Sequence, residues 1–322
     1  MRSALLRTLS AGALVIDQPA LVELLHYLSK GGYRFVAVTP ATHARVLDRP
    51  FDGKPSLRDI FGWNRPFSES DIDETLLALL QEARAVENDC AGKLRSAIRV
   101  ASLEDELFVH SGYPTDQADA VFFGPDTYRF WRFVASEVNG CAQPEHVVDM
   151  GAGSGAGGIL ASRLLGDVRT TLVDVNEKAL AFARANAAVT GVTVECVQSD
   201  EIPDGADLVI ANPPYLMDEA SRTYRDGGGA LLGGAISCAW AEQALRRMPP
   251  GGVMLMYTGA AFTDGSAPLL DAITGLGQDL GAAIRINEID PDVFGEELDC
   301  PSYSKVERIA AVGVRIEKAG GR

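Results

Sequence analysis

The segment that decides the fold is residues 146–158, which read HVVDMGAGSGAGG. An apolar run suited to a buried strand ends at Asp149 and Met150, and a glycine-rich loop follows before a helical pattern at residues 159–165. Glycine lets the backbone turn sharply and approach a ligand, and the free N–H groups at a helix start favour anionic ligand atoms. The segment therefore predicts a loop that binds a nucleotide-type cofactor.

Short apolar runs alternate with helical patterns along the rest of the chain. The predicted strands are residues 146–150, 170–175, 193–198, 206–211, 252–258, 282–289 and 306–316. The predicted helices between them are residues 159–165, 177–189 and 230–248. This alternation is typical of a mostly parallel sheet with helices on both faces, so the predicted fold class is α/β.

A carboxylate ends the strand that follows the glycine loop. Asp174 lies 19 residues after Gly155, where it can accept hydrogen bonds from both hydroxyls of an adenosine ribose. NAD and S-adenosylmethionine would both use such a residue, and Gly151, Gly153 and Ala156 also satisfy the dinucleotide pattern GxGxxG/A. An NAD-dependent oxidoreductase is disfavoured because no histidine follows His146 to serve in catalysis.

A polar segment, Asn212-Pro213-Pro214-Tyr215, follows the fourth predicted strand, at the sheet edge where ligands bind in open α/β sheets. Two prolines remove N–H donors and leave carbonyl oxygens and the Asn212 side-chain oxygen as rigid acceptors. Hydrogen bonds to Asn212 Oδ1 and the Pro213 carbonyl would orient a planar N–H₂ group toward an electrophilic methyl. Tyr215 would pack on the flat face of that group. The segment predicts N-methylation without a strong base, because the proton can leave after methyl transfer.

These motifs, in their order and spacing, resemble the class I S-adenosylmethionine-dependent methyltransferases. The NPPY motif and the glycine pair at Gly233-Gly234 are similar, more narrowly, to the HemK/PrmC type. That group holds the release-factor glutamine-N5 methyltransferases and their methyltransferase small domain relatives. The resemblance covers roughly residues 120–260.

The resemblance implies a Rossmann-like seven-stranded methyltransferase sheet with an antiparallel last strand, and a mainly helical N-terminal domain. It implies S-adenosyl-L-methionine as the cofactor, with Asp174 on the ribose and Asp200 near the adenine. An ordinary surface acid is an equally good interpretation of Asp200. The implied cofactor-binding residues are Asp149, Gly151, Ala152, Gly153, Gly155, Asp174, Val175, Asp200 and Asn212. The implied catalytic residues are Asn212, Pro213, Pro214 and Tyr215.

Three regions are expected along the chain. Residues 1–100 form a helical, winged-helix-like substrate-recognition domain, with helices around residues 21–28 and 76–83. Residues 101–130 form a β-hairpin connector that pairs 106–110 with 119–124, before a helix that begins at Pro125. Residues 131–322 form the methyltransferase domain.

Three features depart from the family and lie in or near regions where the acceptor would be chosen. The N-terminal ~100 residues do not have the pattern of the family's compact helical bundle. Gly124-Pro125-Asp126-Thr127-Tyr128 stands where the family has Arg-Pro-Glu-Thr-Glu, and an acidic insert, residues 290–303, separates the last two strands.

Composition narrows the class of protein. The chain has 322 residues, of which 47% are hydrophobic and 23% charged, as in ordinary globular proteins. No apolar run reaches the ~18 residues that span a bilayer, and residues 1–16 lack a convincing cleavage site. We therefore predict a cytoplasmic protein with no membrane partner. The scattered cysteines and histidines have no metal-ligand spacing, so we predict no metal.

The methyl acceptor has two candidate classes. Residues 1–99 carry a net charge of +1, so residues 100–322 carry −16 of the total of −15. An acidic catalytic domain favours a protein acceptor such as a release factor, methylated on glutamine N5. The alternative is an exocyclic amino group of adenine or guanine in RNA or DNA, but no Lys/Arg cluster with interleaved aromatics supports it. A cofactor-binding protein without catalysis is disfavoured by the intact NPPY motif.

Overall fold

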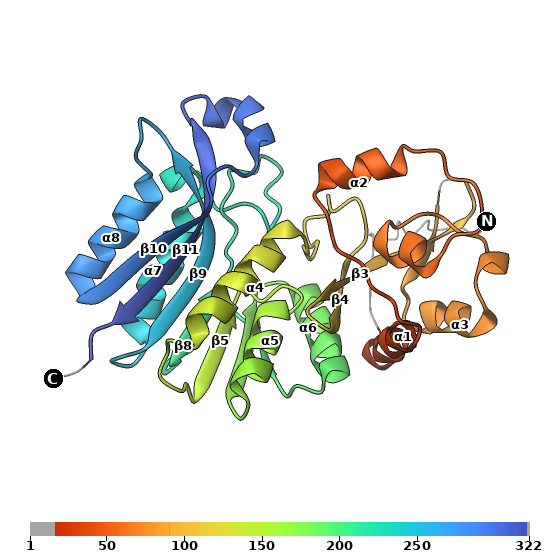
Figure 1. The fold of residues 1–322 in the computed structure, drawn as a ribbon, viewed down its shortest axis with the longest axis horizontal. Coiled ribbons are helices and arrows are strands. Elements are labelled where there is room, and N and C mark those ends of the chain that lie inside the picture. The colour runs from red at the N-terminus through yellow and green to blue at the C-terminus, as the bar shows by residue number, and fades with distance from the viewer. Residues whose placement is uncertain (1–16, 90, 321–322) are drawn as a thin grey trace, which may run out of the picture.

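The computed structural model describes residues 17–89 and 91–320 (Figure 1). The interpretation of residues 1–16 therefore lies outside the described residues. Within them, no helix combines the length and the apolar character needed to cross a membrane.

A seven-stranded sheet forms the centre of the C-terminal part (Figure 1). In spatial order its strands are β10 (Ala282–Asp290), β11 (Arg308–Lys318), β9 (Val253–Phe262), β8 (Leu208–Ala211), β5 (His146–Met150), β6 (Arg169–Asp174) and β7 (Glu195–Gln198). Strands β5 to β9 are parallel, whereas β11 is antiparallel to both of its neighbours. The predicted Rossmann-like α/β sheet with an antiparallel last strand is confirmed. Because parallel strands end at one edge, the segments after β5, β6 and β8 meet there.

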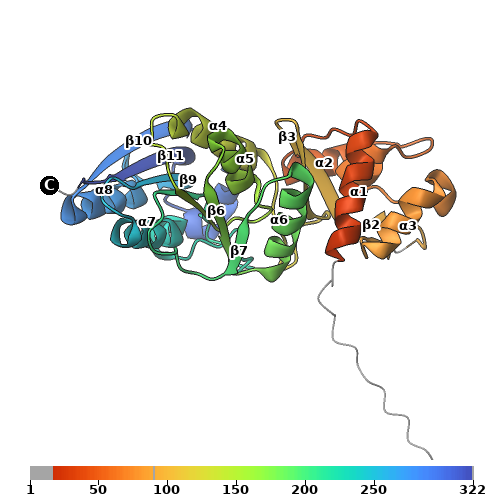
Figure 2. The same ribbon diagram turned by 90° about the horizontal axis from the view of Figure 1, so that it is seen from below.

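Helices cover both faces of this sheet (Figure 2). One face carries α4 (Pro125–Val138), α5 (Ala156–Leu165) and α6 (Glu177–Thr190), and the other carries α7 (Ala235–Arg247) and α8 (Pro268–Leu280). Val147 packs in a core with residues of α4 and α5, and Val148 packs in a second core with residues of α7 and α8. Because successive strand residues point to opposite faces, β5 must be apolar on both.

The expected helix at residues 230–248 begins only at Ala235. Residues 230–233 form the separate 3₁₀ turn η3 (Ala230–Gly233), in which Leu231 and Leu232 have left-handed backbone angles. A Cβ on Gly233 would overlap the carbonyl of Tyr215, so this glycine lets η3 lie against the NPPY motif. The predicted helix therefore starts five residues too early, because the local spacing of apolar residues contains no information on the contact between Gly233 and Tyr215.

The N-terminal part contains three helices and two hairpins. The elements are α1 (Gln18–Lys30), α2 (Pro40–Leu47), η1 (Arg58–Gly62), η2 (Glu69–Asp71), α3 (Glu74–Glu82), β1 (Val86–Asn88), β2 (Leu94–Ser96), β3 (Ile98–Leu103) and β4 (Glu106–Ser111). The side chains of Asp17 and Asp73 accept N–H groups in the first turns of α1 and α3, which explains where both predicted helices begin. Leu24 of α1 shares a core with Phe182 of α6, so this part packs directly on the C-terminal part.

The predicted hairpin between residues 106–110 and 119–124 is wrong. Strand β4 instead pairs with β3, and Leu103 lies opposite Glu106 across a two-residue turn. Such a short loop closes at a smaller entropic cost than the longer connection to residues 119–124. Residues 119–124 are not a strand and lead into α4.

A buried carboxyl group joins β5 to α5. Asp149 is 1% exposed, and its Oδ2 accepts a hydrogen bond of 2.7 Å from the N–H of Gly158 in the first turn of α5. A Cβ on Gly158 would overlap the Leu172 side chain, so glycine allows the helix to lie this close to the sheet. Burial raises the pKa of Asp149 to about 7, and the Gly158 N–H opposes the rise.

Replacing Leu24, which is fully buried in α1, by alanine should lower the free energy of unfolding by about 2–5 kcal/mol, because it leaves a cavity. Urea unfolding followed by circular dichroism measures the loss. Leu164→Ala is the matched control, since Leu164 is 47% exposed, and it should cost less than about 1 kcal/mol. Equal losses in the two variants would contradict the packing of α1 described above.

Asp149 should make the chain less stable as the pH rises from about 4 to about 7. In the unfolded chain this carboxyl ionises near pH 4, whereas in the folded chain it stays protonated up to about pH 7. The folded state binds the extra proton in this window, so raising the pH costs up to about 4 kcal/mol of stability. Asp149→Asn keeps an acceptor for Gly158 and removes the titration.

The Asp149→Asn variant should therefore lose less stability than the wild type between pH 4 and pH 8, as measured by urea unfolding at both values. If variant and wild type show the same pH dependence, the raised pKa of Asp149 does not cause the loss of stability.

Candidate functional site

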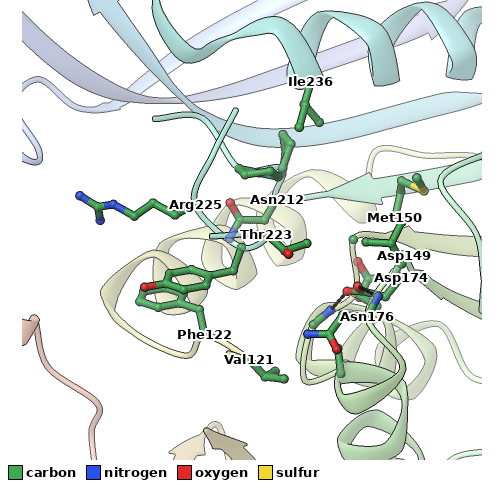
Figure 3. A pocket seen from close by; sticks show the side chains of 18 of the residues that line it. Val121, Phe122, Asp149, Met150, Asp174, Asn176, Asn212, Thr223, Arg225 and Ile236 are labelled. Atoms are coloured by element: carbon green, nitrogen blue, oxygen red, sulfur yellow. Dashed lines mark hydrogen bonds between the residues drawn. The ribbon is translucent and has the colours of Figure 1, made fainter. Parts of the chain in front are cut away.

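A cavity of about 450 Å³ lies at the edge of the sheet where β5, β6 and β8 end. Its volume is within the range of about 300–1,000 Å³ that is usual for small-molecule sites. Asp149, Asp174 and Asn176 lie toward one end, and Asn212, Phe122 and Arg225 lie toward the other (Figure 3). We call these the glycine-loop end and the aromatic end.

The glycine loop brings bare backbone to the cavity wall. Gly151 and Gly153 have φ of 69° and 55°, which favours glycine, and they line the cavity together with Ala152. A Cβ on Gly151 would press against the ring of Trp240, so the loop and α7 can approach closely only with glycine here. Gly155, with φ of 78°, is not among the lining residues and instead caps the start of α5.

The backbone holds Asp174 in place at the glycine-loop end. Its Oδ2 accepts the N–H of Gly153 at 2.8 Å, and its Oδ1 accepts the N–H of Asn176 at 2.9 Å. Burial raises the pKa of Asp174, and these N–H groups oppose the rise. Each oxygen keeps a further lone pair, so the carboxylate can accept hydroxyl groups without reorienting.

Val175 and Asp200 line the same end of the cavity. The lining residues that the sequence patterns missed include Asn176, Trp240 and Gln243. On α7 the lining residues Ile236, Trp240 and Gln243 follow the spacing i, i+4, i+7. That spacing places them on one helix face and is the signal that could have identified them.

The NPPY motif lies in the wall beyond the glycine loop. Asn212, Pro213, Pro214 and Tyr215 all line the cavity. The Asn212 side chain lines the cavity, and Figure 3 draws no hydrogen bond from it to the other side chains shown, so its amide is available to a ligand. The Tyr215 ring is only 8% exposed because it occupies the space left by Gly259, where a Cβ would overlap the ring. Burial raises the pKa of Tyr215, which keeps its hydroxyl protonated.

The start of α4 supplies a buried acid to the cavity wall. Asp126 is 5% exposed, and its Oδ1 accepts the hydroxyl of Tyr257 at 2.7 Å and the Arg129 guanidinium at 3.2 Å. Arg129 also pairs with Asp290 at 3.0 Å. The segment at residues 124–128 that departs from the family pattern therefore forms part of the site, through Asp126 and Thr127.

An aromatic pair lines the end of the cavity beyond Asn212. The rings of Phe122 and Tyr224 are parallel, with centroids 5.5 Å apart. The nearby aromatic residues Phe123 and Trp131, which also precede β5, belong to the core instead. Of the aromatic residues shortly before β5, Phe122 and Phe130 line the cavity.

The residues of this cavity fit S-adenosyl-L-methionine. The preorganised Asp174 carboxylate suits ribose hydroxyls, and the Trp240 ring beside Gly151 suits a flat purine. Carboxylates at Asp174 and Asp126 suit a ligand that carries positive charge. The bare backbone at Gly151 and Gly153 allows close approach.

Comparisons with known proteins agree with this geometry. The family model described as methyltransferase small domain matches residues 133–226. The release factor glutamine methyltransferase of Deinococcus radiodurans is 27% identical over 195 residues, which cover 57% of this chain and 66% of that protein. The ribosomal RNA large subunit methyltransferase G of Vibrio parahaemolyticus is 31% identical over 96 residues, which cover 28% of this chain and 25% of that protein. The chain thus spans less than two thirds of the length of these relatives.

Among solved structures, WT Trm5b from Pyrococcus abyssi is similar, with a TM-score of 0.50 at 16% identity over 88% of this chain and 79% of that chain. This likeness supports the fold alone. The family-model match at residues 133–226 includes the glycine loop and the NPPY motif, which both lie at this edge of the sheet. Residues 133–226 therefore match the methyltransferase small domain family, and the chain is similar to release factor glutamine methyltransferases.

Proposed function

We propose that this chain is an S-adenosylmethionine-dependent N-methyltransferase that methylates the side-chain amide of a protein glutamine. The observation that carries the proposal is the available Asn212 side chain, which lines the cavity on the side of Phe122 and Arg225, across from Asp174 (Figure 3). An acceptor held there would lie directly beside the proposed cofactor site.

The NPPY motif supplies what methylation of an amide requires. The nitrogen of an amide is a poor nucleophile because its lone pair is delocalised into the carbonyl. Asn212 Oδ1 and the Pro213 carbonyl would each accept one N–H of the acceptor, orient the nitrogen and favour the positive charge that develops on it. The two prolines keep these oxygens rigid. The proton is lost to water after transfer, so no basic side chain is required.

When bound, S-adenosylmethionine supplies the electrophilic methyl group. Asp174 would accept the ribose hydroxyls, and Gly151 and Gly153 would let the ligand contact the backbone. The remaining proposed cofactor contacts are Asp149, Ala152, Val175, Asp200 and Asn212. Gly155 would contribute indirectly, by starting α5 where the loop ends.

A protein acceptor is favoured by the charge of the domain and by the relatives. Residues 100–322 carry a net charge of −16, which repels the phosphate backbone of a nucleic acid. The similarity to a release factor glutamine methyltransferase supports glutamine as the residue that is methylated. We propose that residues 1–100 help to recognise this protein, since their core is continuous with α6.

The second candidate acceptor is an exocyclic amino group of adenine or guanine in RNA or DNA. The similarity to a ribosomal RNA methyltransferase supports it, and so do the aromatic rings of Phe122 and Tyr224, on which a base could stack.

Replacing Asn212 by alanine should lower kcat for methyl transfer at least about 100-fold, because one of the two acceptors for the N–H₂ group is lost. Cofactor binding, measured by titration calorimetry, should stay largely intact. Asn139→Ala, at the exposed end of α4, is the matched control and should keep wild-type turnover. Unchanged turnover in Asn212→Ala would rule out the proposed amide clamp.

The class of acceptor can be measured by transfer of radiolabelled methyl into a lysate of cells that lack this protein. We expect protease and not nuclease to release the label, because the acceptor is a polypeptide. Release by nuclease alone would instead favour the amino group of a base.

A further inference from the structure

The aromatic end of the cavity includes one residue from the connection between β10 and β11. This connection, residues 291–307, is made of two short 3₁₀ turns, η4 (Gly295–Asp299) and η5 (Pro301–Tyr303). Its contribution to the lining is the side chain of Phe294. The acidic insert that the sequence singles out therefore reaches the site through an aromatic ring and not through its carboxylates.

Phe294 contacts the NPPY motif and the loop that follows it. Its ring meets the ring of Tyr215 edge-on, with centroids 5.9 Å apart and an angle of 68° between the planes. The guanidinium of Arg225, which also lines the cavity, lies 6.0 Å from the Phe294 centroid. Phe294 thus adds its ring to the aromatic end, beside Tyr215 and near Arg225.

The backbone of Phe294 is strained. Its φ of 58° and ψ of 38° are left-handed, a conformation that is unfavourable for a bulky side chain. It is held there by a hydrogen bond of 2.7 Å from the N–H of Val293 to the carbonyl of Ile309, and by another of 2.9 Å from the N–H of Glu297 to the carbonyl of Phe294. Strain of this kind persists only where the surroundings enforce it, and it is concentrated at functional sites.

Ion pairs and a hydrogen bond tie the insert to the loop after the NPPY motif. Glu297 pairs with Arg225, which also lies 3.4 Å from Asp218. The hydroxyl of Tyr303 accepts the N–H of Met217 at 2.8 Å. These contacts keep the position of the Phe294 ring constant relative to Tyr215.

We propose that Phe294 is a specificity-determining residue for the methyl acceptor. Its ring narrows the aromatic end beside Tyr215, so a slim side-chain amide can reach Asn212, whereas the larger ring system of a nucleobase is kept out. This inference rests on the proposed N-methyltransferase function and adds the means by which an amide is chosen over a base. A pocket rejects a larger ligand through steric overlap, so removing the ring should reduce the preference for an amide over a nucleobase.

The test compares the methylated products of wild type, Phe294→Ala and Phe294→Tyr in the lysate assay. After hydrolysis, chromatography separates labelled N5-methylglutamine from labelled methyladenine and methylguanine. In Phe294→Ala the ratio of methylated base to methylglutamine should rise about tenfold, since a narrowing ring is removed. Phe294→Tyr keeps the ring and should keep the wild-type ratio. The Kd for S-adenosylmethionine should change less than about twofold in both, because Phe294 lies at the far end of the cavity.

Phe262→Ala is the matched control. Phe262 is a half-buried phenylalanine at the end of β9 that stacks with Arg308 and is absent from the cavity lining. Its replacement should leave the product ratio unchanged. A wild-type ratio in Phe294→Ala, or an equal change in Phe262→Ala, would overturn the proposal.

The wild-type enzyme separates this inference from the proposed function. If wild type forms no methylglutamine, the proposed function fails. If it labels mainly bases, the inference fails as well, because the Phe294 ring then does not exclude them. If wild type forms methylglutamine and Phe294→Ala keeps the ratio, only the inference fails.

Discussion

The buried junction between β5 and α5 is the constraint on which the rest of the site depends. Asp149 lies inside the protein and accepts the N–H of Gly158, which sets the direction in which α5 leaves the sheet. The glycine loop between them must then turn within a few residues, and its positive φ angles follow from that requirement. Asp174 of the neighbouring strand bonds to the N–H of Gly153, so the orientation of its carboxylate also depends on this turn.

The two ends of the cavity are built by different physical means. The glycine-loop end is made of backbone groups and one carboxylate, joined by hydrogen bonds between adjacent parallel strands. The aromatic end is made of side chains from α4, the NPPY motif, the loop after it and the insert between β10 and β11. Ring contacts and the Arg225–Glu297 ion pair hold these segments together. Under the proposed function, a glycine-loop end built on rigid backbone and an aromatic end assembled from several separate segments would let one fold serve different acceptors.

Local sequence signals predicted the elements of the sheet well. The strand at residues 146–150 has the predicted bounds, and the helix predicted at 177–189 is α6, because apolar runs and the caps beside them act within one element. The hairpin partner of residues 106–110 was wrong, since two candidate strands of similar composition compete and loop closure decides between them. Helices α2 and α8 were not predicted.

In the candidate site too, local sequence patterns predicted some residues, whereas tertiary contacts decided others. Asn212, Asp174, Gly151 and Gly153 were predicted because each lies at the end of a strand or shortly after it, and parallel strands end at one edge. Trp240 and Phe294 were not predicted as cavity residues, because each reaches the cavity through a contact with a segment far away in the chain.

By itself, the sequence determined the α/β fold and the places of the glycine loop and the Asn-Pro-Pro-Tyr motif at the edge of the sheet, since these depend on residue spacing within one turn or one strand. Only the tertiary structure decided which rings line the aromatic end of the cavity and which carboxyl groups are buried, because both depend on packing between segments that are distant in the sequence.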